Sequence, residues 1–484
     1  MVDFSDYPKQ WMISHALPEP AIAGQSDRFE TYHIQTALAV PVLRLIGADG
    51  EDSGRLIGWV IRDETLHRKN ADIHLPSGMT AENVFATLAG RFVMLWKTRD
   101  GSILFREDSS GNLPASYCAT SRAIASSVTL LDVVTPLPAA DDVNAIFDFP
   151  HRRGFLPFGL TSRRGVRRLM PNHAVDLTNF QPHRIWPSAE FCRRPDMTEA
   201  EARARTVEAG QIVQRHMRAI LAQGETVLYL SGGHDSRMVL AAGREKATNF
   251  RCETFGEPSS LDMHVSSRVA KLAGVAHRNV LFLQPSRDQV KSWLRRTGYS
   301  MYDPVAELVA TTIANAPVNS PISGTGSELP RATNWTLEDT TATGIDIDTL
   351  LKRIRVPDHP AVRAAGQAWL DGIPATADAV MILDLAKIEQ IHGCWSGAAI
   401  YGHPVDLPSL HPFSGQALGE ISLSLPTAYR LGGHFYRHYM ESLWPELLNV
   451  AVNRAEGLDR VRFLRREVTR RIPSRVKRWL KPFR

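Results

Sequence analysis

Residues 225–238 read Glu-Thr-Val-Leu-Tyr-Leu-Ser-Gly-Gly-His-Asp-Ser-Arg-Met, and this stretch decides the fold. Its apolar first half predicts a buried strand, and the polar residues after it predict a turn and the start of a helix. Gly232 and Gly233 allow the backbone to turn sharply and to approach a ligand closely. Asp235 and Ser236 fall at a helix N-terminus, where free N–H groups and the helix dipole favour phosphate. The stretch therefore predicts a phosphate-binding strand–turn–helix unit.

Strands and helices alternate around this unit. We expect a helix over 198–222 with Thr198 as its cap, a helix near 235–246, a strand at 249–255, a helix near 260–274 and a strand at 278–283. Strands that alternate with helices in this way predict a parallel sheet of the α/β class.

The first 185 residues follow a different pattern. Short apolar segments bounded by Gly, Asp or Ser predict strands at 56–61, 90–96 and 102–106. Asp100-Gly101 lies between the last two segments and is a hairpin turn signal. The change of pattern predicts a boundary between two domains near 186–197, as expected for a chain of 484 residues.

Composition excludes several classes of protein. With 43% apolar and 22% charged residues the chain resembles an ordinary globular protein. It has no run of the roughly 18 apolar residues that a membrane span needs, and its first residues lack the pattern of a signal peptide. The cysteines are far apart and form no CxxC pair, which argues against disulfides and a zinc site and favours buried apolar roles: they are Cys118, Cys192, Cys252 and Cys394. We therefore expect a cytoplasmic protein.

The net charge of +5 is unevenly distributed. Residues 457–484 hold eleven Lys or Arg and two acidic residues, a local charge of +9, so the rest of the chain carries about −4. Interleaved apolar residues predict a basic amphipathic helix in this tail, broken or kinked at Pro473. Such a helix suits peripheral contact with an anionic membrane, contact with nucleic acid, or docking on the protein's own surface.

Further motifs follow the glycine-rich turn in an ordered series. They are Thr254-Phe255-Gly256 at the end of the next strand, Asp262 with Ala270, Gly274 and His277, then Asp303-Pro304, Ser323-Gly324-Thr325-Gly326-Ser327-Glu328, and Pro412-Phe413 with Glu420. The first half carries Gly90-Arg91-Phe92, Arg106-Glu107-Asp108 with Gly111, Pro114 and Tyr117, Ala125-Ser126-Ser127, and Gly154, Thr161, Gly165, Leu169 and Pro171.

Through these motifs the chain resembles the asparagine synthetase family, which includes asparagine synthetase B, β-lactam synthetases and lasso-peptide cyclases. Ser231–Ser236 resembles the pyrophosphate loop of ATP pyrophosphatases. The resemblance implies a degenerate N-terminal domain at 1–190, an α+β Ntn-hydrolase-like sandwich of the type 2 glutamine amidotransferases. It implies an ATP pyrophosphatase domain at 197–456, an α/β fold like that of the adenine nucleotide alpha hydrolases, followed by the tail at 457–484.

The resemblance also implies ATP and Mg²⁺ as cofactors, with Asp235 and Glu328 as metal ligands. The residues expected to bind the nucleotide are Leu230, Ser231, Gly232, Gly233, Asp235, Ser236, Thr254, Phe255, Gly256, Ser323 and Gly324. Catalytic roles fall to Asp235 and Glu328 and to a late cation. His434 stands where the family has a lysine, and Arg430 is a nearby alternative.

Besides His434, the chain departs from the family at two further positions. The family's glutaminase uses a cysteine at position 2, whereas this chain has Val2 and no cysteine before Cys118. We therefore expect no glutamine hydrolysis, and a first domain retained as a scaffold. Thr325 replaces an acidic residue of the second nucleotide motif.

The resemblance implies an ATP-dependent ligase that adenylates a carboxylate, releases pyrophosphate, and transfers the acyl group to an amine with release of AMP. One alternative is macrolactam formation on a precursor peptide that a partner protease prepares, as in lasso-peptide cyclases. Another is amidation of a sugar or small acid. Adenylation of tRNA uses the same loop, but the amidotransferase-like first half disfavours nucleic acid. A non-catalytic nucleotide-binding paralogue remains a further alternative, motivated by Val2, Thr325 and His434.

Overall fold

The computed structural model describes residues 2–16, 22–194, 196–315 and 319–455. The amphipathic helix predicted over 457–484 lies outside these residues. Within the described ranges, no helix combines the length and the apolar character that a membrane crossing requires.

Two β-sheets form most of the first half. One has the order β13-β10-β11-β1-β3-β2 and the other β15-β14-β9-β8-β5-β4-β7, with β6 paired to β5. The first contains β1 (Trp11–Ser14), β2 (Gly24–Phe29), β3 (Tyr32–Ala37), β10 (Ser116–Cys118), β11 (Ala123–Ala125) and β13 (Arg167–Arg168). The second contains β4 (Val42–Ile46), β5 (Asp52–Arg62), β6 (Thr65–His67), β7 (Ala71–His74), β8 (Leu88–Lys97), β9 (Ile103–Glu107), β14 (His173–Asp176) and β15 (Gln181–Arg184).

The strands predicted in this half are confirmed. The first two lie within β5 and β8 and the third overlaps β9, shifted by one residue. Strand β8 pairs with β9 in an antiparallel hairpin whose turn contains Gly101 at φ +90°. Apolar residues of both sheets share one core, in which the rings of Trp11 and Phe105 lie 5.7 Å apart. Val2 is buried in the same core. The two-sheet arrangement is therefore observed, while its Ntn-hydrolase-like identity stays a prediction.

The second half contains the predicted parallel sheet. The elements are α5 (Glu199–Leu221), β16 (Thr226–Tyr229), α6 (Asp235–Ala242), β17 (Phe250–Phe255), α7 (Leu261–Ala273) and β18 (His277–Val280). Strands β16, β17 and β18 are parallel neighbours, and bridges at Ile322 and Leu410 extend the sheet beyond β16. Thr198 caps α5 in a reciprocal capping box with Glu201. Helix α6 ends four residues earlier than expected, because the chain tightens into the 3₁₀-helix η3 (Arg244–Asn249) after Gly243.

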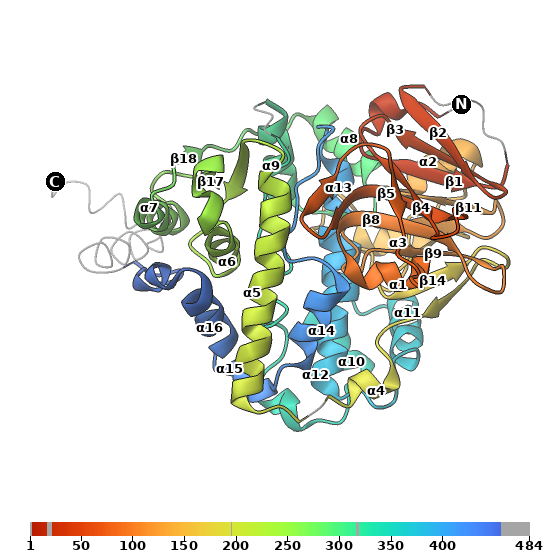
Figure 1. Cartoon of the computed structure of the whole chain (residues 1–484). Coiled ribbons are helices and arrows are strands. Elements are labelled where there is room, and N and C mark those ends of the chain that lie inside the picture. Colours follow the sequence, from red (N-terminus) through yellow and green to blue (C-terminus); the bar gives the residue numbers. More distant parts are fainter. Residues whose placement is uncertain (1, 17–21, 195, 316–318, 456–484) are drawn as a thin grey trace, which may run out of the picture.

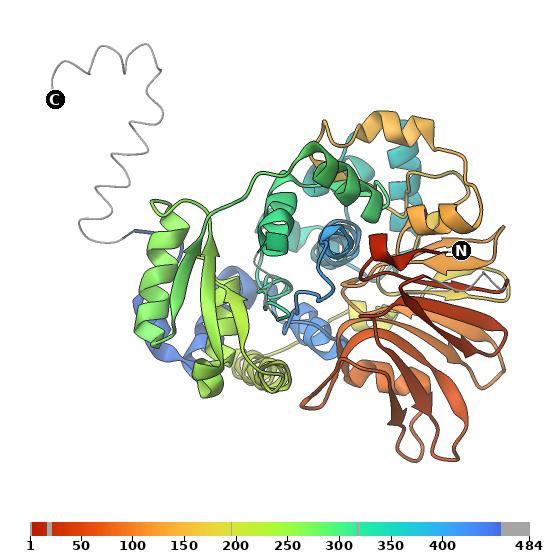
Figure 2. The same cartoon turned by 90° about the horizontal axis from the view of Figure 1, so that it is seen from above.

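Figure 1 shows the parallel sheet on the left, the β-sandwich on the right and α5 between them; Figure 2 shows the same order from above. The remaining helices are α1 (Ala81–Val84), α2 (Val128–Val134), α3 (Asp141–Phe147), α4 (Ala189–Cys192), α8 (Arg287–Arg296), α9 (Pro304–Asn315), α10 (Ile347–Ile354), α11 (Pro360–Asp371), α12 (Ala379–Ala386), α13 (Ala399–Gly402), α14 (Gln416–Ser424), α15 (Thr427–Leu431) and α16 (His434–Leu443). A π-helix, η5 (Lys387–Ser396), continues α12.

Packing crosses the predicted boundary between the halves. Helix α3 shares an apolar core with α10 and α12 of the second half. Strand β12 (Gly154–Phe155) pairs with β19 (Met301–Tyr302). The segment around 140–160 therefore joins the two halves and, as shown below, lines a cavity beside the candidate site.

Candidate functional site

The two glycine-rich motifs meet at the carboxyl edge of the parallel sheet. A Cβ atom added to Gly324 would lie 2.6 Å from the carbonyl carbon of Asp235 and 2.7 Å from the amide nitrogen of Ser236. The hydroxyl of Ser327 donates a hydrogen bond of 2.8 Å to Asp235 Oδ1. The Ser231–Ser236 loop and the Ser323–Glu328 loop therefore form one site, although about 90 residues separate them in the sequence.

Hydrogen bonds within the site hold the first loop in its shape. The amide of Ser231 donates to Ser236 Oγ (2.9 Å), that of Gly232 to Asp262 Oδ1 (2.9 Å) and that of Gly233 to Ser231 Oγ (3.2 Å). The resemblance to the pyrophosphate loop leads us to expect that these amides donate to bound pyrophosphate. A bound pyrophosphate would have to exchange with these partners, and Asp262 is the charged one.

The end of β17 lies next to this loop, as the expected nucleotide site requires. Thr254 Oγ1 donates to the carbonyl of Leu230 at 2.7 Å, which ties the two strand ends together. The ring of Phe255 stacks on Phe282 with centroids 5.7 Å apart and planes 13° apart. Gly256 follows with φ +117°, a conformation that favours glycine. The two stacked rings form an apolar surface beside the loop, against which a planar ring such as adenine can pack.

The carboxylate of Asp235 forms an ion pair with Arg331. Arg331 Nη2 and the Ser327 hydroxyl both contact Asp235 Oδ1, while among the described residues no hydrogen bond reaches Oδ2. Burial raises the pKa of Asp235 above its usual value; Arg331 opposes this shift, and the negative charge of Glu328 adds to it. The partly exposed Asp235 thus keeps one oxygen open for a divalent cation.

Glu328 is held by two basic residues of the π-helix. Its Oε1 accepts a hydrogen bond of 2.8 Å from His392 Nε2 and lies 3.6 Å from Lys387 Nζ, while its Oε2 accepts one from the amide of Gly326. Burial alone would raise the pKa of Glu328, but His392 and Lys387 outweigh it and hold this pKa well below its usual range. Glu328 is therefore an ionised carboxylate whose charge is already compensated.

Arg430 is not a free cation at this site. Its guanidinium is buried, forms hydrogen bonds of 2.5 and 2.8 Å with the carboxylate of Asp384, and donates to the carbonyl of Leu329 at 2.6 Å. The structure does not support the expectation of a catalytic Arg430, because its donors are engaged in a buried ion pair. The bond to Leu329 instead makes Arg430 a support for the second loop.

The contacts of His434 are also with residues outside the two glycine-rich loops. It packs against Tyr429 and His438, whereas His234 of the first loop contacts Tyr436. In the part of the chain that the structure describes, Glu199, His434 and His438 are the one group of three potential ligands whose donor atoms lie within 4.8 Å of one another, so they can hold a metal ion. The assignment of His434 as the late cation is therefore not supported; Lys387 lies beside Glu328 instead.

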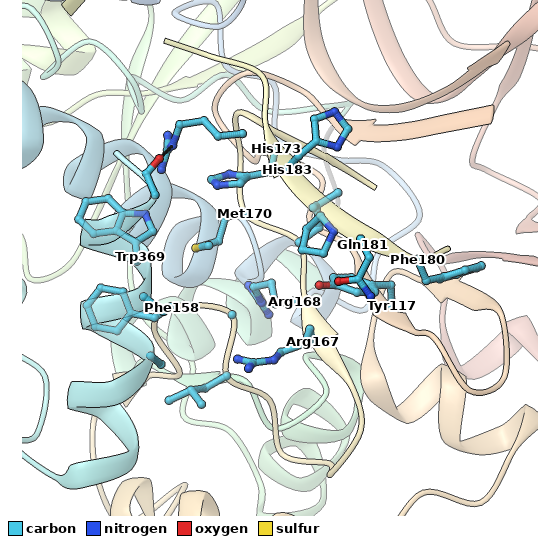
Figure 3. Close-up of a pocket in the computed structure, with 18 of the residues that line it drawn as sticks. Tyr117, Phe158, Arg167, Arg168, Met170, His173, Phe180, Gln181, His183 and Trp369 are labelled. Carbon is cyan, nitrogen blue, oxygen red and sulfur yellow. Dashed lines mark hydrogen bonds between the residues drawn. The ribbon is translucent and has the colours of Figure 1, made fainter. Parts of the chain in front are cut away.

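Two of the cavities among the described residues differ in their distance from the candidate chemistry. One of about 250 Å³ lies between the halves and is lined by Tyr229 and Thr325 on one side and by Lys9 and Arg91 on the other. The second, of about 720 Å³, lies against the sandwich, with Phe158 and Trp369 on one side and Phe180 and Gln181 on the other (Figure 3). No residue of either glycine-rich loop lines this second cavity, so it is remote from the candidate chemistry.

Sequence reasoning missed Arg331, Lys387 and His392. Arg331 had a weak signal, because it follows Glu328 by three positions in the same loop. Lys387 and His392 had none, since they reach Glu328 only through a π-helix, an uncommon element that is frequent at functional sites. The prediction that the cysteines are buried is confirmed for all four.

No protein-family model matches the chain, and neither does a curated protein.

Proposed function

We propose that the chain is an ATP-dependent ligase of the asparagine synthetase type that adenylates a carboxylate and transfers it to an amine. The observation that carries the proposal is the close approach of Gly324 to Asp235 and Ser236, which unites two nucleotide-type loops at the carboxyl edge of a parallel sheet. In open α/β sheets this edge is where ligands bind.

The proposed reaction has two steps. An oxygen of the substrate carboxylate bonds to the α-phosphorus of ATP, and the bond from that phosphorus to the bridging oxygen of pyrophosphate breaks. The amine nitrogen then bonds to the acyl carbon, the bond to the AMP oxygen breaks, and the amine loses a proton. Both steps need aligned reactants and compensation of negative charge, which oriented cations supply.

Of the two expected metal ligands, Asp235 fits a magnesium ion better than Glu328 does. Asp235 offers an open carboxylate oxygen, a ligand type that Mg²⁺ prefers. Glu328 fits less well, because His392, Lys387 and the Gly326 amide already engage its oxygens. Mg²⁺, when bound with ATP, neutralises phosphate charge. We assign Asp235 to hold it and Glu328 to orient the two basic residues.

Lys387 is the cation that best suits the carboxylate to be activated. Its ammonium lies 3.6 Å from Glu328, and its side chain is partly buried. A positive charge there can hold the attacking carboxylate and then stabilise the oxyanion that forms when the amine attacks. Val2 is buried, and position 2 holds no cysteine. Both observations support a free amine as the second substrate, rather than ammonia released from glutamine by the first domain.

The test is an analysis of products by ³¹P NMR after incubation with ATP, Mg²⁺ and pools of acids and amines. Formation of AMP and pyrophosphate that depends on an added acid supports the proposal. Formation of ADP and phosphate would contradict it, because that pattern belongs to transfer of the γ-phosphoryl group.

A non-catalytic nucleotide-binding protein is the second candidate. The contact between Arg331 and Asp235 favours it, because this cation occupies one of the carboxylate oxygens assigned to metal binding. Binding of ATP without turnover by any acid pool would favour this candidate.

A further inference from the structure

A basic cavity of about 760 Å³ adjoins the candidate site. It lies between the end of α3 and β12 on one side and the end of α10 and the π-helix on the other. Five cationic residues line it, and no acidic residue does: Arg152, Arg153, Arg353, Arg355 and Lys387. This size suits a small-molecule ligand.

Three of these cations have carboxylate partners outside the cavity lining. Arg153 pairs with Asp303 (2.9 Å), Arg353 with Asp339 (2.8 Å) and Lys387 with Glu328 (3.6 Å). Among the described residues, Arg152 and Arg355 have no such ion pair, and both are exposed. The cavity therefore carries positive charge that the protein itself does not compensate.

The basic cavity shares a residue with the candidate site. Lys387 belongs to both, since it lines the cavity and lies beside Glu328. Thr333 and Asn334 line the cavity two and three positions after Arg331, the residue that contacts Asp235. A ligand in the cavity can thus extend toward both carboxylates of the site.

One wall of the cavity is flat and aromatic. Trp395 and Phe155 stack with centroids 5.8 Å apart and planes 10° apart, and the Arg153 guanidinium lies 5.1 Å from the Trp395 ring. Guanidinium groups match the geometry of phosphate oxygens, and an aromatic wall packs against the face of a sugar or a planar ring.

We propose that the basic cavity binds an acid substrate through a second anionic group, a phosphate or diphosphate ester, while the carboxylate to be activated lies at Lys387. The assignment rests on the proposed function. Arg152 and Arg355 contact the phosphate oxygens, and the aromatic wall covers the part of the substrate between the phosphate and the carboxylate.

The experiment measures binding by calorimetry with the nucleotide site filled by α,β-methylene ATP and Mg²⁺. The probes are 3-phosphoglycerate, UDP-glucuronate and the phosphate-free acids glycerate and glucuronate. The test variant is Arg152→Gln/Arg355→Asn, because Asn tolerates the positive φ of 58° at position 355. The control is Arg167→Gln, an exposed cation that lines the remote cavity of Figure 3.

We expect at least one phosphorylated probe to bind at least about tenfold more tightly than its phosphate-free analogue, and the double variant to lose about tenfold or more of that affinity. The control should bind like wild type. Equal binding of phosphorylated and phosphate-free acids, no binding of either class, or an equal loss in the control would overturn the inference. Release of pyrophosphate with phosphate-free acids alone would also overturn it, yet would leave the ligase function standing. Phosphate-selective binding without pyrophosphate release under ATP would instead uphold the anion site and contradict the ligase.

Discussion

The Lys387 ammonium lies 3.6 Å from the Glu328 carboxylate, although 59 positions separate the two residues in the sequence. The pair links the second glycine-rich loop to the π-helix and to the basic cavity. It therefore provides the most direct route to testing how the site handles negative charge.

Replacement of Lys387 by Met keeps the length of the side chain and removes its charge. We expect acid-dependent pyrophosphate release to fall by roughly 100-fold, as for loss of an oriented charge-stabilising group. ATP binding, measured by calorimetry, should change little. Lys387→Arg is the matched control and should retain part of the activity. Unchanged release in Lys387→Met would remove this residue from the reaction.

Gly324→Ala tests the close approach of the two loops. The added methyl group would lie 2.6–2.7 Å from backbone atoms of Asp235 and Ser236, so one loop must move. We expect affinity for ATP to fall by about tenfold or more, because the phosphate-binding geometry is displaced. Gly344→Ala is the control, since nothing lies within 4 Å of its Cβ position. Similar ATP affinities in the two variants would argue against a shared nucleotide site.

His434→Ala separates the sequence-based role of this histidine from its observed surroundings. Because its ring packs against Tyr429 and His438, we expect pyrophosphate release within about twofold of wild type. The measurement is the rate at saturating ATP. A loss comparable to that of Lys387→Met would restore His434 as the late cation.

Lys9 gives a prediction for stability against pH. Burial, with a smaller contribution from Arg296, lowers the pKa of Lys9 to about 7 from 10.5. Between these values the unfolded chain binds more protons than the folded chain, so folding becomes more favourable as the pH rises, and the cost of burying Lys9 is greatest below pH 7. The ammonium donates to the carbonyls of His403 and Val405.

Lys9→Met removes this cost together with the two hydrogen bonds. Relative to wild type, its unfolding free energy should decrease by on the order of 3 kcal/mol between about pH 6.5 and about pH 9.5. Urea denaturation at both pH values measures the difference. A difference that does not vary with pH would mean that Lys9 keeps an ordinary pKa in the fold.

Local patterns predicted much of the second half of the fold. Thr198 and Glu201 form the capping box that begins α5, and the turn after β16 has the residues that a phosphate loop needs. The end of α6 differed, because Gly243 stops the helix and a 3₁₀ segment follows. Patterns of this kind act over a few residues, which is why they can be read from the sequence.

Tertiary packing decided what the sequence did not predict. Arg430 lies near the expected position of a late cation, yet its guanidinium pairs with Asp384, 46 positions away. Lys387 and His392 reach Glu328 because the helix after α12 adopts π geometry. No local motif encodes either arrangement, so the charge balance of the site required the structure.

Asp235→Asn tests the central claim most directly, through pyrophosphate release with ATP, Mg²⁺ and an acid pool in variant and wild type. The account predicts acid-dependent release with equal AMP from the wild type, and a loss of roughly 100-fold in the variant while its circular dichroism is unchanged. Equal release from both proteins, or release that ignores the acid, would contradict carboxylate adenylation at this site.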